Sequence, residues 1–341
     1  MKKNRAILSF LLVLLMVGAM AFATACGDNN AGGSGVEDDG ETVFTLRAGH
    51  SHPVEHPYHI AFLQMAENVY EQTNGRVIID VHPNSTIGAE RELLEGLTLG
   101  TVDLVVSSTA PAVGIVPGLG ILDLPFLFDN REAAVSVLES EIGDDLLAQL
   151  GNAGIIGMSW GENGFRHITN SVHPINSPDD LRGIKIRTQE NRTHLAAFEL
   201  LGAQPTAMAW TEALTALQQG AIDAQENPAV IINQFNLFDM GQTYMSLTGH
   251  VYSVAFYLMS QDTYNRLPAD LRAVVLAEGR LAGPNQRNLV AAMEQDSISS
   301  IREQGMHVVD NINLDPFRAA ITPIYDDFPN QELLNRILDA Q

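Results

Sequence analysis

The sequence predicts an α/β fold with two lobes and a cleft between them. Short runs of β-branched residues alternate with longer amphipathic segments, a pattern typical of an open sheet covered by helices. The alternation occurs twice, in residues 44–159 and in residues 177–258. Because the chain passes between these two sets more than once, we expect two sheet units with separate cores. About 300 residues after the N-terminal segment are enough for both.

The first set predicts a β-α-β-α-β arrangement. Apolar residues recur at helical spacing between Ile60 and Tyr70, and Gly100 is placed to end the second helix. A longer helical stretch follows, and then a strand that leads toward Arg166. In chain order we expect a strand at 44–48, a helix at 57–72, a strand at 77–81, a helix at 90–99, a strand at 103–107, helix at 131–150 and a strand at 154–159.

The second set begins at Ser177, a typical N-cap residue followed by acidic residues in the first turn of a short helix. Further on we expect strands at 184–187, 221–225 and 251–258, helices at 192–201 and 210–219, and mostly helix over 260–305, including a long helix at 285–303. The chain is then expected to cross between lobes near residues 163 and 253. This predicts lobe I from 42–163 and 254–293, and lobe II from 164–253 and 294–341.

The N-terminus is typical of a bacterial secretory signal. Residues 2–5 are basic, residues 7–25 carry no charge, and small residues precede Cys26, the only cysteine. We therefore expect residues 1–25 to be a lipoprotein-type signal peptide and Cys26 to be lipidated, with plain secretion as the alternative. A retained membrane helix is disfavoured by the small residues beside the cysteine. Residues 26–41 are small, polar and acidic, and predict a flexible tether.

The net charge of −22 excludes a polybasic partner surface. Without residues 1–25 the chain keeps 16 basic and 41 acidic residues, and Lys185 is its only lysine. Such a surface repels nucleic acid and anionic lipid headgroups, so we expect no nucleic-acid partner. With one cysteine no intrachain disulfide is available. The sequence contains no phosphate loop, nucleotide fingerprint or zinc-ligand spacing, so no cofactor and no metal are expected.

The most informative residues are Arg187 and the polar segment that follows forty residues later. The segment 183–187 (Gly-Ile-Lys-Ile-Arg) predicts a strand that ends on an arginine, and the segment 223–228 (Asp-Ala-Gln-Glu-Asn-Pro) predicts a strand that enters a polar turn. An arginine at the carboxyl end of a strand is well placed to bind a carboxylate, because its planar guanidinium matches both oxygens. The alternative is a surface arginine at a strand end.

Several motifs together resemble the solute-binding proteins of tripartite ATP-independent periplasmic (TRAP) transporters, the dicarboxylate-binding family. The resemblance extends from about residue 44 to the C-terminus in consistent order. It is carried by Gly75-Arg-Val, Asp123-Leu-Pro-Phe-Leu-Phe128, Pro178-Asp-Asp-Leu-Arg-Gly-Ile-Lys-Ile-Arg187, Gly202-Ala-Gln-Pro-Thr206, Glu212-Ala-Leu-Thr-Ala-Leu-Gln-Gln-Gly220 and Asp223-Ala-Gln-Glu-Asn-Pro228.

The resemblance implies a periplasmic-binding-protein-like fold of type II, in which two lobes close about a hinge on a ligand. It implies that Arg187 forms a salt bridge with the ligand carboxylate and that Arg166 assists, unless Arg166 pairs with a nearby acid. It also implies that the remaining contacts come from Asn227, Trp210, Glu90, Ser108, and Ser51 or His52. Ser108 stands where sialic-acid-binding members carry a glutamate, so sialic acid is not expected.

Two motifs have competing interpretations. His50, His52, His56 and His59 cluster like metal ligands, but their spacing matches no zinc pattern, and a loop bordering the cleft is favoured. Residues 157–161 (Gly-Met-Ser-Trp-Gly) match the nucleophile elbow of serine hydrolases, which would make Ser159 a nucleophile. That elbow requires a helix directly after the serine, and the following residues do not predict one.

The expected function is therefore a non-enzymatic, extracytoplasmic receptor that captures a small organic acid and delivers it to TRAP membrane permease subunits. We expect it to be periplasmic or anchored to the membrane by lipid. Dicarboxylates, hexuronates and keto-gulonates satisfy the same arginine, and an ectoine-like zwitterion is an alternative because Glu90 could meet an ammonium group. The competing classes are a secreted hydrolase that uses Ser159 and a structural surface lipoprotein without a ligand.

Overall fold

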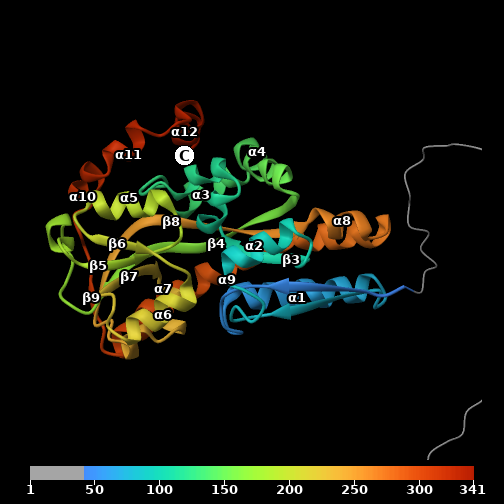
Figure 1. Ribbon diagram of the computed structural model, residues 1–341, viewed down its shortest axis with the longest axis horizontal. Helices are drawn as coiled ribbons and strands as arrows, with labels where there is room; N and C mark the ends of the chain where they lie inside the picture. The colour runs from blue at the N-terminus through green and yellow to red at the C-terminus, as the bar shows by residue number, and fades with distance from the viewer. Residues whose placement is uncertain (1–41) are drawn as a thin grey trace, which may run out of the picture. The chain divides into compact units, whose positions relative to one another are not determined.

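The structure is a computed structural model that describes residues 42–341. The predicted signal peptide, Cys26 and the predicted tether lie outside the described residues. Within residues 42–341 the strands form a single nine-stranded sheet (Figure 1). In chain order the strands are β1 Phe44–Gly49, β2 Val77–His82, β3 Leu104–Ser108, β4 Ile155–Asn170, β5 Lys185–Thr188, β6 Gln204–Ala207, β7 Ala224–Pro228, β8 Tyr244–Ser260 and β9 His307–Val309.

Helices occupy the connections between the strands. The α-helices are α1 Pro57–Gln72, α2 Glu90–Thr98, α3 Arg131–Leu138, α4 Glu141–Ala148, α5 Arg192–Leu200, α6 Trp210–Gln218, α7 Ala229–Gln234, α8 Gln261–Arg266, α9 Ala269–Glu303, α10 Asp315–Ala320, α11 Thr322–Asp326 and α12 Gln331–Asp339. The short 3-10 helices are η1 Ala110–Gly114, η2 Pro117–Asp123, η3 Gln149–Ala153, η4 Pro178–Leu181 and η5 Leu237–Met240. None of the helices in the described part of the chain is long and apolar enough to cross a bilayer.

Two long antiparallel strands, β4 and β8, join two halves of the sheet (Figure 1). The strand order is β2-β1-β3-β8-β4-β7-β5-β6. β3 pairs with residues 255–259 of β8, whereas β7 pairs with residues 166–170 of β4. We call β1, β2 and β3 with their helices the first half, and β5, β6 and β7 with theirs the second half. The two sheet units expected from the sequence are thus halves of one continuous sheet.

The crossing strands are longer than the sequence predicts because buried polar residues continue their ladder of hydrogen bonds. Polar and charged residues between Glu162 and Arg166 interrupt the apolar pattern, yet they are paired and buried in β4. The pairing shifts register between Glu162 and Gly164, where Gly164 adopts a φ of 115° that favours glycine.

Helix α9 spans 35 residues and packs against both halves, on α1 and on α7. The sequence predicts mostly helix over 260–305, with a long helix that begins at about Asn285, after Pro284. In the structure the helix begins at Ala269 and continues through the proline. Gly279 and Gly283 bring α9 close to β4, since a Cβ on Gly283 would lie 2.2 Å from the carbonyl oxygen of Trp160.

The helical stretch expected over 131–150 consists of α3 and α4, which are separate because Ser140 caps α4 by accepting from the backbone N–H of Ile142. One further expectation needs correction. Residues 226–228 do not form a polar turn, because they pair with β4 as the end of β7, and α7 begins directly afterwards.

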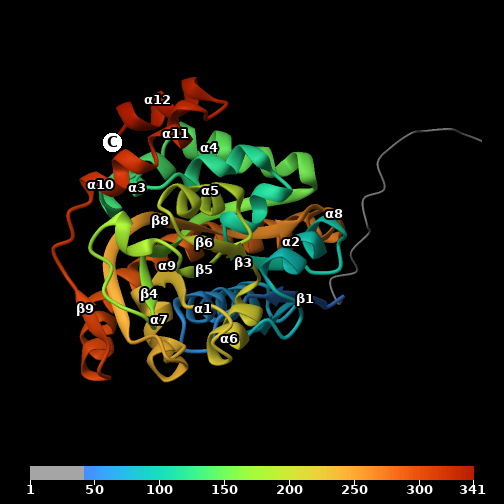
Figure 2. The same ribbon diagram turned by 60° about the vertical axis from the view of Figure 1, so that its left-hand side comes forward.

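The C-terminal helices α10, α11 and α12 lie beside α5 and α3 (Figures 1 and 2). Phe317 belongs to the same hydrophobic cluster as Phe198 of α5, and Leu334 and Ile337 belong to the cluster that includes Leu138 of α3. The Tyr325 hydroxyl donates to the carbonyl oxygen of Pro125 at 2.8 Å.

Candidate functional site

Arg187 occupies the carboxyl half of β5, as predicted, and its side chain is 3 % exposed. Its Nε and Nη2 donate to the carbonyl oxygen of Met208 at 3.0 and 2.8 Å, and the guanidinium lies 5.3 Å from the ring centroid of Trp210. No carboxylate of residues 42–341 forms an ion pair with it. The backbone and the indole therefore orient this cation without neutralising it.

The electrostatic surroundings of Arg187 favour an anion. Burial, assisted by the charge of Arg166 and opposed by that of Glu226, lowers the pKa of Arg187 to about 10. Arg187 thus remains charged at neutral pH although its charge is poorly solvated. A carboxylate placed against the guanidinium would relieve this imbalance through charge-assisted hydrogen bonds.

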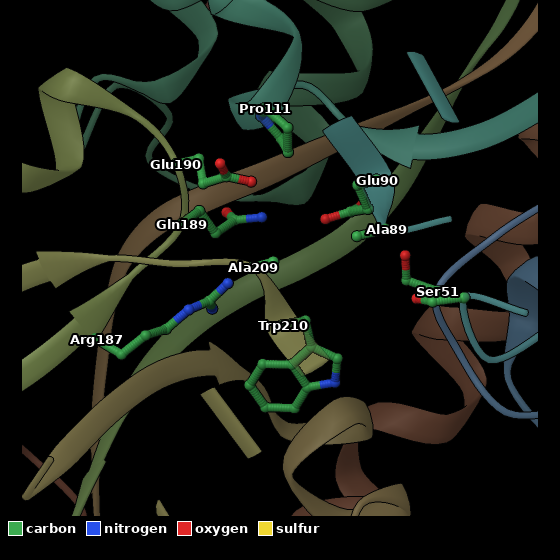
Figure 3. Close-up of a pocket in the computed structure, with 10 residues that line it drawn as sticks. Ser51, Ala89, Glu90, Pro111, Arg187, Gln189, Glu190, Ala209 and Trp210 are labelled. Atoms are coloured by element: carbon green, nitrogen blue, oxygen red, sulfur yellow. The ribbon is translucent and has the colours of Figure 1, made fainter. Parts of the chain in front are cut away.

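Arg187 borders a small cavity between the two halves of the sheet (Figure 3). Both halves supply lining residues. The second half contributes Arg187, Gln189, Glu190, Ala209 and Trp210, and the first half contributes Ser51, Ser85, Ala89, Glu90 and Pro111. Arg187 and Trp210 lie on one side of the cavity in Figure 3, and Glu90 and Ser51 lie on the other.

Glu90 is the first residue of α2 and is held by hydrogen bonds to β3. One carboxylate oxygen, Oε1, accepts from the Ser107 hydroxyl at 3.1 Å and from the backbone N–H and hydroxyl of Ser108 at 2.9 and 3.1 Å. A negative charge at this position is also stabilised by the dipole of α2. Ser108 is consequently engaged by Glu90, and its hydroxyl accepts from Gln189 Nε2 at 2.8 Å.

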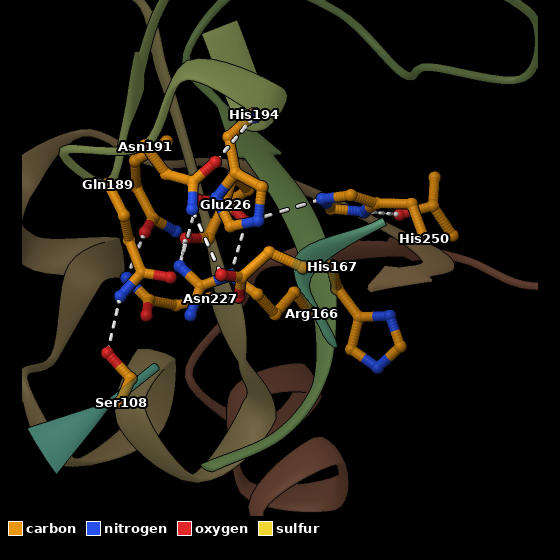
Figure 4. A network of polar contacts seen from close by, with 12 residues as sticks. Ser108, Arg166, His167, Gln189, Asn191, His194, Glu226, Asn227 and His250 are labelled. Carbon is orange, nitrogen blue, oxygen red and sulfur yellow. Dashed lines mark hydrogen bonds and ion pairs between the residues drawn. The ribbon is translucent and has the colours of Figure 1, made fainter. Parts of the chain in front are cut away.

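Arg166 lies on β4 and is completely buried beside Glu226 of β7 (Figure 4). Arg166 Nε and Nη2 donate to the two carboxylate oxygens of Glu226, and Nη2 also donates to its carbonyl oxygen. Burial raises the pKa of Glu226, but the charge of Arg166 and the hydrogen bond from His250 outweigh burial and lower that pKa below its usual range. The pairing with a nearby acid that the sequence left open is therefore present. Arg166 Nη1 is buried and has no partner within residues 42–341.

Asn227 and Trp210 have different positions relative to the cavity. Trp210 begins α6 and lines the cavity, with its ring packed edge-on against Phe235. Asn227 is buried on β7, donates from Nδ2 to Gln225 Oε1 at 2.6 Å and is not among the lining residues.

Ser51 lines the cavity and His52 lies next to it in the chain, within an aromatic cluster. The His52 ring stacks on His56 at a centroid distance of 4.1 Å and meets Tyr58 edge-on. Burial, assisted by the charge of Arg166, lowers the pKa of His52 to about 3, so this ring is neutral. Ser51 Oγ and both ring nitrogens of His52 have no partner among the described residues.

Within residues 42–341 neither competing motif has the geometry that its functional interpretation requires. Within residues 42–341 no group of three or more His, Cys, Asp or Glu side chains is arranged to hold a metal ion. Ser159 lies inside the continuous strand β4, and its hydroxyl donates to the carbonyl oxygen of Gly279 at 2.6 Å and accepts from the N–H of Gly283. The serine thus anchors α9 and is not on the strand-to-helix turn that a nucleophile elbow requires.

Sequence reasoning missed several lining residues. Gln189 and Glu190 directly follow β5, and their position after a strand end was an available signal. Ser85, Ala89, Pro111 and Ala209 lie in loops or at helix ends, where no residue pattern marks them. Glu226 was part of the quoted motif, but its pairing with Arg166 depends on the register between β7 and β4.

The chain is similar in sequence to known bacterial solute-binding proteins. Residues 48–332 match the family described as bacterial extracellular solute-binding protein, family 7 (DctP). A solute-binding protein of Verminephrobacter eiseniae is 39 % identical over 285 residues, which cover 83 % of this chain and 85 % of the relative.

Two solved structures are similar throughout the fold. A TRAP periplasmic solute-binding protein from Polaromonas sp. JS666 bound to D-erythronate is 38 % identical, has a TM-score of 0.84 and covers 87 % of this chain and 98 % of its own. The sugar acid binding protein of Advenella mimigardefordensis in complex with galactonate is 31 % identical, also with a TM-score of 0.84, and covers 88 % and 98 % of the two chains.

Proposed function

Because this chain belongs to the bacterial extracellular solute-binding proteins of family 7, a family of two-lobed TRAP receptors for small organic acids, we propose that it captures a sugar acid by a salt bridge from Arg187 and delivers it to a TRAP permease. One observation carries the proposal. Arg187 is a buried, charged guanidinium that borders a cavity and forms no ion pair with any carboxylate of residues 42–341. A buried cation of this kind requires an anionic partner.

The acidic residues that line the cavity favour hydroxyl groups over a second carboxylate. Glu90 and Glu190 both line it, so a distal carboxylate would meet like charge, whereas a hydroxyl could donate to either residue. The bound ligands of the two similar structures, D-erythronate and galactonate, each combine one carboxylate with several hydroxyls. We therefore favour a polyhydroxylated monocarboxylate over the dicarboxylates that the sequence left open.

The other predicted residues complete the proposed site. Arg166 offers its Nη1, Ser51 its hydroxyl and His52 a neutral ring nitrogen, and these buried atoms have no partner in the described chain. Trp210 packs against the ligand, and Asn227 helps to orient it. Ser108 acts through Glu90 and Gln189.

Ligand binding closes the two lobes about the crossing strands. The boundaries proposed from the sequence, 42–163 with 254–293 and 164–253 with 294–341, fall where Gly164 pairs with Ser253 beside a register shift. The closed form is the one that the permease recognises. Lipidation of Cys26 holds the receptor at the membrane.

The test is a thermal-shift panel of D-erythronate, galactonate, galacturonate, succinate and ectoine on the purified protein. A ligand at 100 times its dissociation constant stabilises by about 2.7 kcal/mol. We expect a sugar acid to stabilise the wild type and Arg182→Ala, an exposed arginine control, but not Arg187→Ala.

Arg187→Lys keeps the charge but lacks the planar guanidinium that binds both carboxylate oxygens. The ligand should therefore raise the unfolding temperature of this variant only slightly. A sugar acid that stabilises Arg187→Ala as well as the wild type would show that the salt bridge is assigned to the wrong residue. Ester hydrolysis lost in Ser159→Ala would instead favour the hydrolase.

A further inference from the structure

Three consecutive residues after β5 bridge the two halves of the sheet. Gln189 Nε2 donates to Ser108 Oγ at 2.8 Å, and Glu190 lies 3.6 Å from Arg91 of α2. Asn191 Nδ2 donates to Asp123 Oδ2 at 3.0 Å and to the carbonyl oxygen of Ala110 at 3.3 Å. Figure 4 shows Gln189 and Asn191 side by side on this segment. Each of the three residues thus contacts a different residue of the first half.

The two hydrogen-bonded bridges are buried, and the ion pair is not. Gln189, Asn191, Ser108 and Asp123 are all at most 4 % exposed. The Arg91–Glu190 pair is partly solvated, with side-chain exposures of 56 % and 28 %, so it contributes little. Buried hydrogen bonds are less weakened by solvent, and Asp123 is fully buried. The Asn191–Asp123 contact is therefore the main bridge.

Asn191 is fixed in place by a second role. Its Oδ1 accepts from the backbone N–H groups of Thr193 and His194, so it caps α5, while its Nδ2 faces the first half. The orientation of the amide is consequently set by the helix that follows, and Nδ2 is presented to Asp123 as a donor.

Asp123 is a fully buried carboxyl group that contacts only neutral partners. Oδ1 accepts from the Thr109 hydroxyl at 3.0 Å and Oδ2 accepts from Asn191, and no cation of residues 42–341 forms an ion pair with it. Two charged groups influence the pKa of Asp123: Arg166 on β4 lowers it and Glu226 on β7 raises it, so their effects oppose one another. Helix η2 also packs against α5, which carries His194, and against β8, which carries His250, Tyr252 and Tyr257.

We infer that residues 189–191 form a clasp that holds the lobes closed over the ligand, and that formation of the Asn191–Asp123 contact is coupled to protonation of Asp123. This inference rests on the proposed function, because it concerns closure of the same cleft. Opening separates Asn191 from Asp123 and admits water to the carboxyl group. Closing buries that carboxyl group again, which favours its neutral form.

The direction of the pH dependence follows from the burial of Asp123. Burial raises the pKa of Asp123 to about 7, although Thr109, Arg166 and Asn191 oppose this. In the open form the pKa lies nearer to the ordinary value of about 3.9. The closed form therefore binds more protons between about pH 4 and pH 7. Ligand affinity is expected to fall up to about tenfold per pH unit as the pH rises through this window, and to level off above about pH 7.

Asp123→Asn imitates the protonated group. In this variant we expect the new amide oxygen, Oδ1, to accept from Asn191 and the new amide nitrogen, Nδ2, to donate to the Thr109 hydroxyl. That hydroxyl can then donate to the carbonyl oxygen of Val254, 3.4 Å away. Asn191→Ser keeps a good cap on α5 but lacks the donor that reaches Asp123. Asn130→Ser is the matched control, because Asn130 caps α3 in the same way and is exposed.

The experiment is calorimetric titration with galactonate between pH 5.5 and 8.5, in two buffers that differ in ionisation enthalpy. We expect the wild type to take up protons on binding below pH 7, and Asp123→Asn to bind with a pH-independent affinity. Asn191→Ser should bind at least tenfold more weakly than Asn130→Ser at pH 6. An unchanged pH profile in Asp123→Asn, or equal affinities of the two serine variants, overturns the clasp.

If galactonate binds neither wild type nor variants, it is not the ligand, and the clasp is then tested on the unliganded protein. Hydrogen exchange at residues 192–195, corrected for its intrinsic pH dependence, should show protection that falls as the pH rises from 5.5 to 7.5 in the wild type but not in Asp123→Asn. Equal protection profiles would overturn the clasp independently of the ligand.

Discussion

Arg166 and Glu226 form an ion pair in which neither side chain reaches solvent, at 0 % and 1 % exposure. Two nitrogens of the guanidinium bind the two carboxylate oxygens, and His250 Nε2 lies 3.3 Å from one of those oxygens. The pair is neutral as a whole and lies close enough to Arg187 for both charges to act on it. It therefore leaves Arg187 as the cation that a carboxylate can neutralise.

Removal of one charge of this pair should destabilise the protein strongly. Glu226→Gln leaves Arg166 buried without its counter-ion, and breaking a buried ion pair in this way costs about 3–5 kcal/mol. Urea denaturation at pH 7 measures the loss. Asp310→Asn is the control, because the Arg302–Asp310 pair is about half exposed on both sides and should change stability by less than about 1 kcal/mol. Similar losses in both variants would contradict this account.

The sequence predicts much of the architecture because local patterns specify it. The local pattern of apolar and polar residues places α1, β2 and α5 within one residue of their observed bounds. It also predicts Arg187 at the cavity, because the carboxyl end of a strand in an open sheet faces the cleft. These features depend on neighbours in the chain.

The features that sequence reasoning misses depend on contacts between distant residues. The segment with Glu226 and Asn227 was expected to be a turn because its residues are polar, but pairing with β4 makes it a strand. The clasp joins Asn191 to Asp123, 68 residues away, and a single sequence contains no pattern for such a pair. The same holds for the length of β8, since tertiary pairing outweighs local preference.

Glu90 should select against a second carboxylate in the ligand. In Glu90→Gln the like charge is gone, so succinate affinity should rise relative to the wild type, while galactonate affinity should fall about tenfold because a charged acceptor for a hydroxyl is lost. The readout is the ratio of the two dissociation constants in each protein. Since both ligands are measured on the same variant, a general loss of folding would lower both affinities together. A parallel change in both would rule out a selective role for Glu90.

The buried histidines should make the fold sensitive to mild acid. Burial lowers the pKa of His194 to about 3, assisted by Arg166 and opposed by Glu226, while the unfolded value is about 6.5. The neutral ring therefore contributes stability above pH 6.5 that is lost as the pH falls toward 3. His194→Gln cannot take up this proton, so the slope of unfolding free energy between pH 6 and 4 should decrease by up to about 1.4 kcal/mol per pH unit. An equal slope in both proteins would show that His194 does not contribute.

The close approach of α9 to β4 should tolerate no added methyl group at Gly283. A Cβ there would lie 2.2 Å from the carbonyl oxygen of Trp160 and 2.7 Å from Ser159 Oγ, and neither atom is at the end of a flexible chain. Gly283→Ala should therefore cost at least about 1–3 kcal/mol, the usual range for overpacking. Gly114→Ala is the control, because its Cβ would have no atom within 4 Å. Thermal unfolding of the two variants compares them directly. If Gly283→Ala unfolds at the same temperature as Gly114→Ala, α9 can move away from β4 at little cost, and the packing is looser than these distances require.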